Sequence, residues 1–123
     1  MKKAFVLGFM SLVLSLLSFS VAEASEGLKI VPNKDVCMVT NVYFGRPQIP
    51  VVQGGKTYYG CCEMCKTTLT TDASSRTAAD PVTGARVDKA KALIAALPDG
   101  SVLYFENQTN FAKYKNQMTQ NKK

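Results

Sequence analysis

Three cysteines lie within five residues in the stretch YYGCCEMCK, and the chain has one further cysteine, Cys37. Four cysteines in a small exported domain first suggest a disulfide framework. Neighbours such as Cys61 and Cys62 form a bridge only with strained geometry, however, and a bridge from Cys62 to Cys65 closes a loop too small to constrain the unfolded chain much. The clustering therefore favours a shared metal ion over disulfides as the partner of these thiols.

A strand that delivers Cys61, followed by a turn that delivers Cys65, can point both sulfurs inward while Cys37 approaches from a separate strand or loop. Gly60 would let the backbone come close to an ion. Thiolates are soft ligands that favour Cu(I) or Zn(II). The chain has no histidine, the usual nitrogen ligand, so we favour copper. We expect Cys37, Cys61 and Cys65 to bind the metal.

The fourth cysteine of the set, Cys62, has three alternative roles. It replaces Cys61 in a CxxC pair, acts as a fourth ligand, or exchanges metal with a partner protein. Met38 and Met64 stand beside cysteines and are candidate accessory ligands. Methionines more often fill irregular gaps in a core, which is the alternative for both.

Residues 1–24 are predicted to be a secretory signal peptide. Lys2 and Lys3 precede the apolar run AFVLGFMSLVLSLLSFSVA, which ends at the small-residue site Ala22-Glu23-Ala24. This order is typical of cleaved leaders, although the run is also about as long as a short membrane span. We expect export to the bacterial periplasm or secretion, with no stable membrane anchor after cleavage.

The composition of the remaining chain excludes several functions. Removing the leader leaves 13 basic and 8 acidic residues, scattered except for a final NKK, so no stripe suited to phosphates appears and we expect no nucleic-acid partner. The absence of histidine removes the commonest general base and the Cys/His and Ser/His nucleophilic arrangements. We therefore expect a protein without catalytic turnover.

The first part of the mature chain is predicted to form short strands. Residues 25–34 are expected to be a flexible segment. Residues 35–62 are rich in β-branched and aromatic residues, which Gly45-Arg46-Pro47 and Gly54-Gly55 divide into strands and turns. Residues 63–71 are expected to form one or two helical turns, although their threonines are unfavourable.

The later part mixes helices and a strand. Its predicted elements are a connector over 73–79, a helix over 87–97, a strand over 101–106, a helix over 107–118 and a polar tail over 119–123. VDKAKALIAAL places apolar residues and alanines at helical spacing and is followed by Pro98 and Gly100. SVLYFE alternates like a strand, and Asn107 or Thr109 can cap the last helix.

The two parts of the chain echo each other, which predicts an internal repeat. DVCM followed by GGKTYYGCCEMCKTTL aligns with DPVTG followed by DGSVLYFENQTNFAKY, with similar intervening lengths. The alignment sets residues 35–72, the first unit, against residues 80–118, the second unit. It pairs Cys37 with Thr83, Cys61 with Glu106, and Cys65 with Asn110. We predict an α+β fold of two small treble-clef or zinc-ribbon-like strand–strand–helix units, of which only the first keeps its cysteines.

These motifs resemble the TRASH/YHS-like metal-binding domains, named for trafficking, resistance and sensing of heavy metals. Members of this family have a first cysteine, a gap, a Cys-x3-Cys that ends a strand often reading YYFCS, and a short helix with an aromatic residue or leucine. DVCM, GGKTYYGCCEMC and Leu69 follow this order. The resemblance implies ligands at Cys37, Cys61 and Cys65, and the second unit looks like the same module without its ligands.

We expect an exported metal-binding protein that acts in metal trafficking, buffering or resistance, with a metal-donor or metal-acceptor protein as its partner. A structural zinc or disulfide module that supports a protein-binding surface is one alternative. A thiol-disulfide oxidoreductase is another, because Cys62-Glu63-Met64-Cys65 is a CxxC motif. Such a motif should open a long helix, however, and KTTLTTDASSRT is a poor helix former.

Overall fold

The computed structural model describes residues 27–122, so the predicted signal peptide lies outside the described part. In chain order the elements are β1 (Lys29–Ile30), η1 (Asn33–Asp35, a 3-10 turn), β2 (Val36–Cys37), β3 (Val42–Tyr43), β4 (Ile49–Gln53), β5 (Lys56–Gly60), α1 (Glu63–Thr71), η2 (Ala73–Arg76, a 3-10 turn), β6 (Thr77–Ala79), β7 (Arg86–Asp88), β8 (Leu93–Ala96), β9 (Val102–Phe105) and α2 (Gln108–Gln120).

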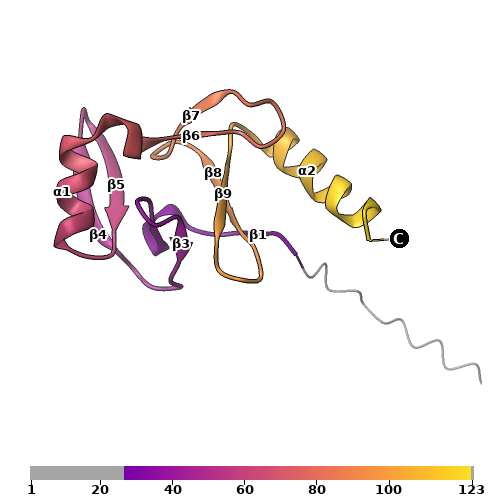
Figure 1. The fold of residues 1–123 in the computed structure, drawn as a ribbon, viewed down its shortest axis with the longest axis horizontal. Helices are drawn as coiled ribbons and strands as arrows, with labels where there is room; N and C mark the ends of the chain where they lie inside the picture. Colours follow the sequence, from indigo (N-terminus) through magenta and orange to yellow (C-terminus); the bar gives the residue numbers. More distant parts are fainter. Residues whose placement is uncertain (1–26, 123) are drawn as a thin grey trace, which may run out of the picture.

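The described chain is therefore an α+β protein built from small antiparallel pairings and two helices (Figure 1). Helix α1 lies beside the β4–β5 hairpin at one end of the molecule, and α2 extends from the β8–β9 hairpin at the other end. Neither of these two helices is long and apolar enough to cross a membrane.

A tight hairpin leads directly into α1. Strands β4 and β5 pair along their whole length and close at Gln53 opposite Lys56. Gly54 and Gly55 both have positive φ, 59° and 74°, the backbone that a two-residue hairpin turn requires. The strand-and-turn prediction for this stretch is confirmed, and Cys61 and Cys62 connect the end of β5 to the start of α1.

Helix α1 forms although threonine is a weak helix former. The hydroxyls of four threonines each donate a hydrogen bond of 2.9–3.1 Å to the carbonyl four residues earlier: Thr67, Thr68, Thr70 and Thr71. The buried residues Cys65 and Leu69 lie one helical turn apart, on the side that packs against β4 and β5. The predicted helix is confirmed, and its nine residues exceed the one or two turns expected.

The second hairpin belongs to a three-stranded sheet in the order β1-β8-β9. Helix α2 packs against it through two edge-on aromatic contacts, because the rings of Phe111 and Tyr114 each lie 5.7 Å from the ring of Phe105. The Asn107 side chain accepts a 2.9 Å hydrogen bond from the Asn110 amide. The predicted terminal helix and its Asn107 cap are therefore confirmed.

The predicted helix over residues 87–97 is wrong, because this segment forms β7, a turn and β8. Asp88 makes the turn: its side chain accepts the Ala90 amide at 2.9 Å, and its carbonyl accepts the Ala92 amide at 2.9 Å. The apolar run that follows is buried as a central strand between β1 and β9. For such a short apolar run, the spacing of apolar residues does not distinguish a buried helix from a buried strand.

Two segments expected to lack regular structure are ordered by pairing. In the predicted flexible segment 25–34, the described part forms β1, and Leu28 and Val31 are each only 4% exposed. The predicted connector 73–79 forms η2 and β6, and β6 pairs with β7. Both corrections have one cause: short apolar or small residues gain strand partners from distant parts of the chain.

The core joins the two units rather than filling each separately. Its larger cluster combines residues of both: Val36, Met38, Val51, Tyr58 and Leu69 from the first unit with Val87, Ile94, Val102 and Tyr104 from the second. Asp88 adds a polar link, since it accepts hydrogen bonds from Lys56 and from the Tyr58 hydroxyl, at 2.5 and 2.9 Å. The cysteines are therefore supported by a hydrophobic core to which both units contribute.

Candidate metal centre

Three of the four cysteines converge from separate elements. Cys37 ends β2 and is fully buried, Cys61 follows β5 and is exposed, and Cys65 lies in the first turn of α1 with 6% of its surface exposed. Their Sγ atoms all lie within 4.8 Å of one another. The structure therefore brings together the three residues that the sequence predicts as ligands, and this cluster can hold a metal ion.

Backbone contacts set this convergence. The Met38 amide donates a 2.8 Å hydrogen bond to the Tyr59 carbonyl, which fixes the end of β2 beside β5. A Cβ atom on Gly60 would lie 2.9 Å from the Cβ of Cys65, closer than such atoms approach. Gly60 thus lets the end of β5 approach α1, a more specific role than the approach to an ion that we expected.

The sulfur separations suit a shared ion. The Sγ atom of Cys65 lies 3.8 Å from that of Cys37 and 3.7 Å from that of Cys61. Two thiolates about 2.3 Å from one metal are about 3.8 Å apart in a tetrahedron and about 4.0 Å apart in a trigonal plane. All four cysteines are free thiols, so the ligand atoms are not used up in disulfides.

The fourth cysteine and the two methionines lie differently. Cys62 is exposed at the N-cap of α1, with its Sγ atom 3.5 Å from that of Cys65, and it does not belong to the group of three. Met38 is fully buried in the core cluster, whereas Met64 is 78% exposed on the first turn of α1. Cys62 is thus a neighbour of the cluster on its solvent side.

The first negative charge of the cluster is favoured at Cys37. Burial opposes this thiolate, but hydrogen bonds from the Thr40 hydroxyl and from backbone groups of Thr40, Val39 and Cys61 outweigh burial and lower the pKa of Cys37 from 9.0 to about 7. Such donors commonly orient and charge a metal-binding sulfur. A thiolate is the form that a metal binds, so Cys37 is close to that form near neutral pH.

The other thiols respond to Cys37 and to one another. Burial, followed by hydrogen bonds with the neighbouring thiols, raises the pKa of Cys65 to about 12. A hydrogen bond with Cys37 is the largest cause that raises the pKa of Cys61, whereas a backbone hydrogen bond at Cys65 lowers the pKa of the exposed Cys62. A bound cation reverses the effect of crowding and displaces these protons.

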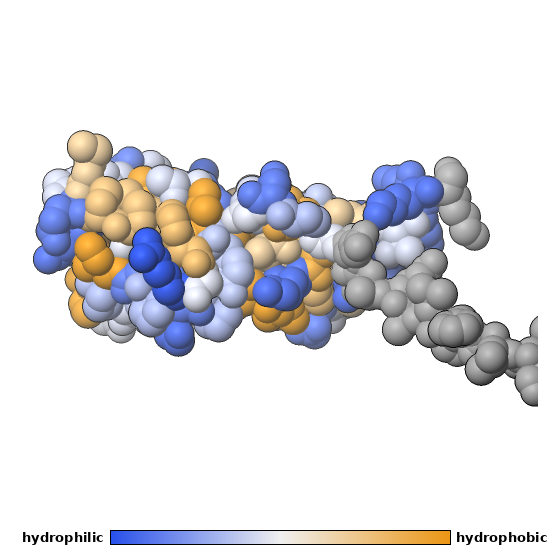
Figure 2. Space-filling model, turned by 90° about the horizontal axis from the view of Figure 1, so that it is seen from below, coloured by the Kyte–Doolittle hydropathy of each residue, from blue (hydrophilic) through white to orange (hydrophobic). Residues whose placement is uncertain are grey.

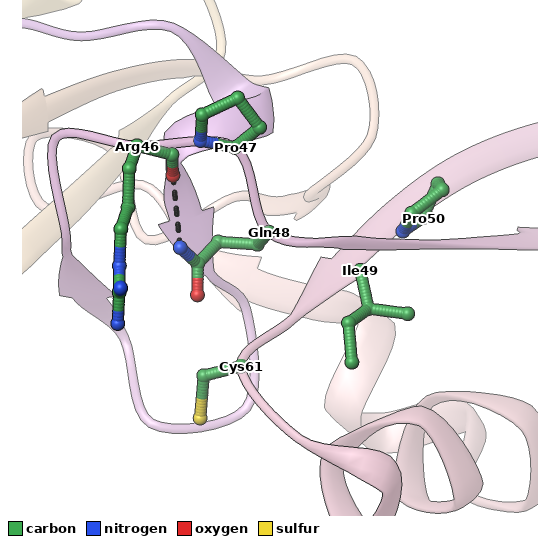
Figure 3. A pocket seen from close by; sticks show the side chains of 6 residues that line it. All are labelled: Arg46, Pro47, Gln48, Ile49, Pro50 and Cys61. Carbon is green, nitrogen blue, oxygen red and sulfur yellow. Dashed lines mark hydrogen bonds between the residues drawn. The ribbon is translucent and has the colours of Figure 1, made fainter.

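The cluster opens to solvent beside an exposed hollow. A depression of about 400 Å³ is lined by the β3–β4 loop, the start of β4 and the exposed thiol: Arg46, Pro47, Gln48, Ile49, Pro50 and Cys61 (Figure 3). The Gln48 side chain donates a 2.8 Å hydrogen bond to the Arg46 carbonyl and so helps to hold this loop. Seen from below, the α1 end of the molecule carries a mixed surface of hydrophobic and hydrophilic residues (Figure 2).

The loop that follows Cys37 is held by the second unit, which the sequence did not reveal. Asn41 has a left-handed backbone, with φ at 56°, and its side-chain oxygen accepts hydrogen bonds from Lys89 and from the Tyr104 hydroxyl at 3.0 and 2.8 Å. Lys89 also donates to the Met38 carbonyl at 2.6 Å. No local motif marks these residues, because their role depends on contacts across the fold.

A carboxylate occupies the equivalent junction between β9 and α2. The side chain of Asp80, 1% exposed, accepts hydrogen bonds from the Glu106 amide, the Asn110 side chain and the Val82 amide at 2.8, 2.9 and 2.7 Å. The Thr83 amide lies at 3.4 Å. The residues aligned with the three cysteines thus all contact Asp80.

No protein-family model, no curated protein and no solved structure matches this chain.

Proposed function

We propose that this protein binds a soft metal ion through the thiolates of Cys37, Cys61 and Cys65, and that it serves metal trafficking, buffering or resistance after export. The observation that carries the proposal is the convergence of three sulfur atoms from β2, the end of β5 and α1 within 4.8 Å. Such a set suits thiophilic ions and is poorly suited to Ca²⁺ or Mg²⁺, which prefer oxygen ligands.

Cu(I) is the favoured ion, with Zn(II) as the alternative. Three sulfurs satisfy Cu(I), whereas structural Zn(II) sites are almost always tetrahedral with four ligands. A fourth ligand would have to come from Cys62, whose sulfur lies 3.5 Å from that of Cys65 on the exposed side of the cluster. The whole chain has no histidine to supply a nitrogen.

We also propose that the two units are versions of one TRASH/YHS-like module. Two features support this idea: β5 and β9 each end three residues before the helix that follows begins, and the cap residues share their backbone. Cys62 has φ −154° and ψ 173°, and Asn107 has φ −157° and ψ 173°. A metal-donor or metal-acceptor protein of the same exported compartment is the proposed partner.

The test uses residues 25–123, purified with and without a reductant, and measures metal content, free thiols and Cu(I) affinity by competition with a chelator. We expect a single tightly bound ion per chain and thiols that the metal protects from alkylation. Cys37→Ser removes the buried ligand and should abolish tight binding. Thr67→Ser, on the exposed side of α1, is the matched control and should bind like the unchanged protein.

Three outcomes would redirect the assignment. A metal-free protein without free thiols would contradict any metal function. A zinc ion that resists chelators, and whose removal unfolds the chain, would favour the structural module. Disulfide exchange that depends on Cys62 and Cys65 would favour the oxidoreductase, since these sulfurs lie 3.5 Å apart at the start of α1.

A further inference from the structure

Lys89 is a buried ammonium group with no acidic partner among residues 27–122. It lies just after β7 and is only 5% exposed. Its Nζ atom donates to the Met38 carbonyl at 2.6 Å and to the Asn41 side-chain oxygen at 3.0 Å, and it lies 5.0 Å from the centre of the Tyr104 ring. These partners are two acceptors and one π face, which is the environment of a charged amine with three donors.

A buried charge is costly unless an opposite charge lies near it. Within residues 27–122 the ion pairs join Lys34 to Asp35, Lys56 to Asp88 and Lys66 to Glu63, and Lys89 takes part in none of them. Neutral oxygens solvate the amine but do not neutralise it. The position of Lys89 therefore calls for a negative charge from another source.

The backbone next to Cys37 connects Lys89 to the thiol cluster. Lys89 contacts the carbonyl of Met38, the residue that follows the ligand Cys37 in the chain. Burial lowers the pKa of Lys89, and the negative charge of Cys37 opposes this change, so the two groups interact electrostatically. Lys89 comes from the second unit, and its contacts with Met38 and Asn41 also hold the loop that supplies hydrogen bonds to the Cys37 sulfur.

We propose that Lys89 is the counter-charge of the thiolate cluster, and that the second unit thereby sets the metal preference of the first. The inference rests on the proposed metal-binding function. Three thiolates around Cu(I) carry a net charge of −2, whereas three thiolates around Zn(II) carry −1. A fixed positive charge nearby stabilises the more negative complex more, so Lys89 favours Cu(I) over Zn(II). It acts as a positioning and specificity-determining residue rather than a ligand.

The experiment compares Cu(I) and Zn(II) affinities in variants that separate charge from structure. Lys89→Met and Lys89→Gln remove the charge, and the glutamine amide keeps a donor for the Met38 carbonyl. We expect both to lose about tenfold more affinity for Cu(I) than for Zn(II). Lys89→Arg keeps the charge and should preserve the ratio of the two affinities. Lys91→Met removes an exposed lysine two residues away and should change neither affinity.

Tyr104→Phe supplies a structural reference. It removes a hydrogen bond to Asn41 without changing charge, so it should weaken both metals equally if it weakens either. An equal loss for both metals in Lys89→Met or Lys89→Gln, or no loss in either, would overturn the proposal. If Lys89→Met does not fold, the ratio of Cu(I) to Zn(II) affinity in Lys89→Gln and Lys89→Arg tests the proposal instead. Absence of binding in the unchanged protein would refute the metal function itself, a different result.

Discussion

The two hairpin-to-helix junctions share a backbone and differ in what fills them. In the first unit, the turn between β5 and α1 supplies Cys61, and the first turn of α1 supplies Cys65, to a cluster of free thiols. In the second unit, the Glu106 amide in the turn between β9 and α2 and the Asn110 side chain in the first turn of α2 donate hydrogen bonds to the carboxylate of Asp80. The same local geometry can thus be completed by internal hydrogen bonds or left for a cation to complete.

This comparison separates stability from binding. The Asp80 junction is closed by groups of the chain itself, so it should contribute to folding without any ligand. The thiol junction crowds ionisable sulfurs, an arrangement that a metal stabilises and that protons otherwise neutralise. Substitutions at the Asp80 junction should therefore change the stability of the metal-free protein, whereas substitutions at the thiol junction should change its metal affinity.

The largest expected effect is the loss of metal binding in Cys37→Ser. A hydroxyl replaces the buried thiolate of lowest pKa among the three ligands, so we expect Cu(I) affinity to fall about a thousandfold, or about 4 kcal/mol. Competition with a Cu(I) chelator measures this change. Retained affinity would show that the ion is held elsewhere, and the first junction would then resemble the second in needing no metal.

Asp80→Asn should destabilise the protein by about 2–3 kcal/mol, because an amide replaces a buried acceptor that faces several donors. Urea unfolding of the metal-free protein measures the free energy. Asp99→Asn alters an exposed carboxylate that makes local hydrogen bonds with Ser101 and is the matched control. A loss of Cu(I) affinity in folded Asp80→Asn would contradict the separation of the two junctions.

The stability that Asp80 supplies should also depend on pH. Burial opposes its carboxylate, but hydrogen bonds from Glu106, Asn110, Val82 and Thr83 outweigh burial and lower its pKa. The unfolded value is about 3.9. The contribution is therefore fully present above that value and is lost as the pH falls through the lower folded value. Unfolding curves of the protein and of Asp80→Asn should converge as the solution is acidified, and parallel curves would contradict this assignment.

Gly60→Ala should cost about 1–3 kcal/mol, the usual penalty for overpacking, because the new methyl would meet Cys65. It should also weaken Cu(I) binding, since the clash separates β5 from α1. Gly84→Ala in the second unit is a useful comparison, because its positive φ is strained by a side chain while its surroundings are open. We expect Gly84→Ala to lower stability but to leave metal affinity unchanged, as parallel unfolding and metal titrations would show.

The smallest expected effects concern the helix caps. Asn107→Ala removes the hydrogen bond to the Asn110 amide and should cost about 1 kcal/mol. Cys62 makes no side-chain cap bond, and serine is a much better cap, so Cys62→Ser should stabilise the metal-free protein by up to about 1 kcal/mol. Thermal unfolding measures both changes. A destabilised Cys62→Ser protein would show that the thiol supports the fold. It would contradict the view that the cap of α1 is weaker than the cap of α2.

The cysteine cluster was predictable because its chemistry is specific. Three thiols within five residues are poorly placed for disulfides and well placed to share a metal ion. The hairpin before α1 was predictable from Gly54-Gly55, and the cap of α2 from Asn107. The segment 87–97 was not, because its pairing with β1 and β9 overrides a helical pattern. Long-range pairing likewise ordered β1, which the sequence alone suggested was flexible.

The polar residues that support the site were beyond sequence reasoning for a different reason. Lys89 and Asp80 look like ordinary surface charges in the sequence, yet they are 5% and 1% exposed. Each has hydrogen-bond partners far away in the chain: Met38 for Lys89, 51 residues away, and Glu106 for Asp80, 26 residues away. Only the folded arrangement shows that Lys89 contacts the backbone next to Cys37 and that Asp80 fills the junction between β9 and α2.

Unequal access to the three thiols gives the site a direction. Cys37 and Cys65 are buried, whereas Cys61 borders the open hollow formed with residues 46–50. An incoming ligand would therefore meet a bound ion from the side of Cys61, and that bond would be the first to yield. The burial of the three thiols would thus set the order in which their bonds to a bound ion break, with the bond to Cys37 breaking last.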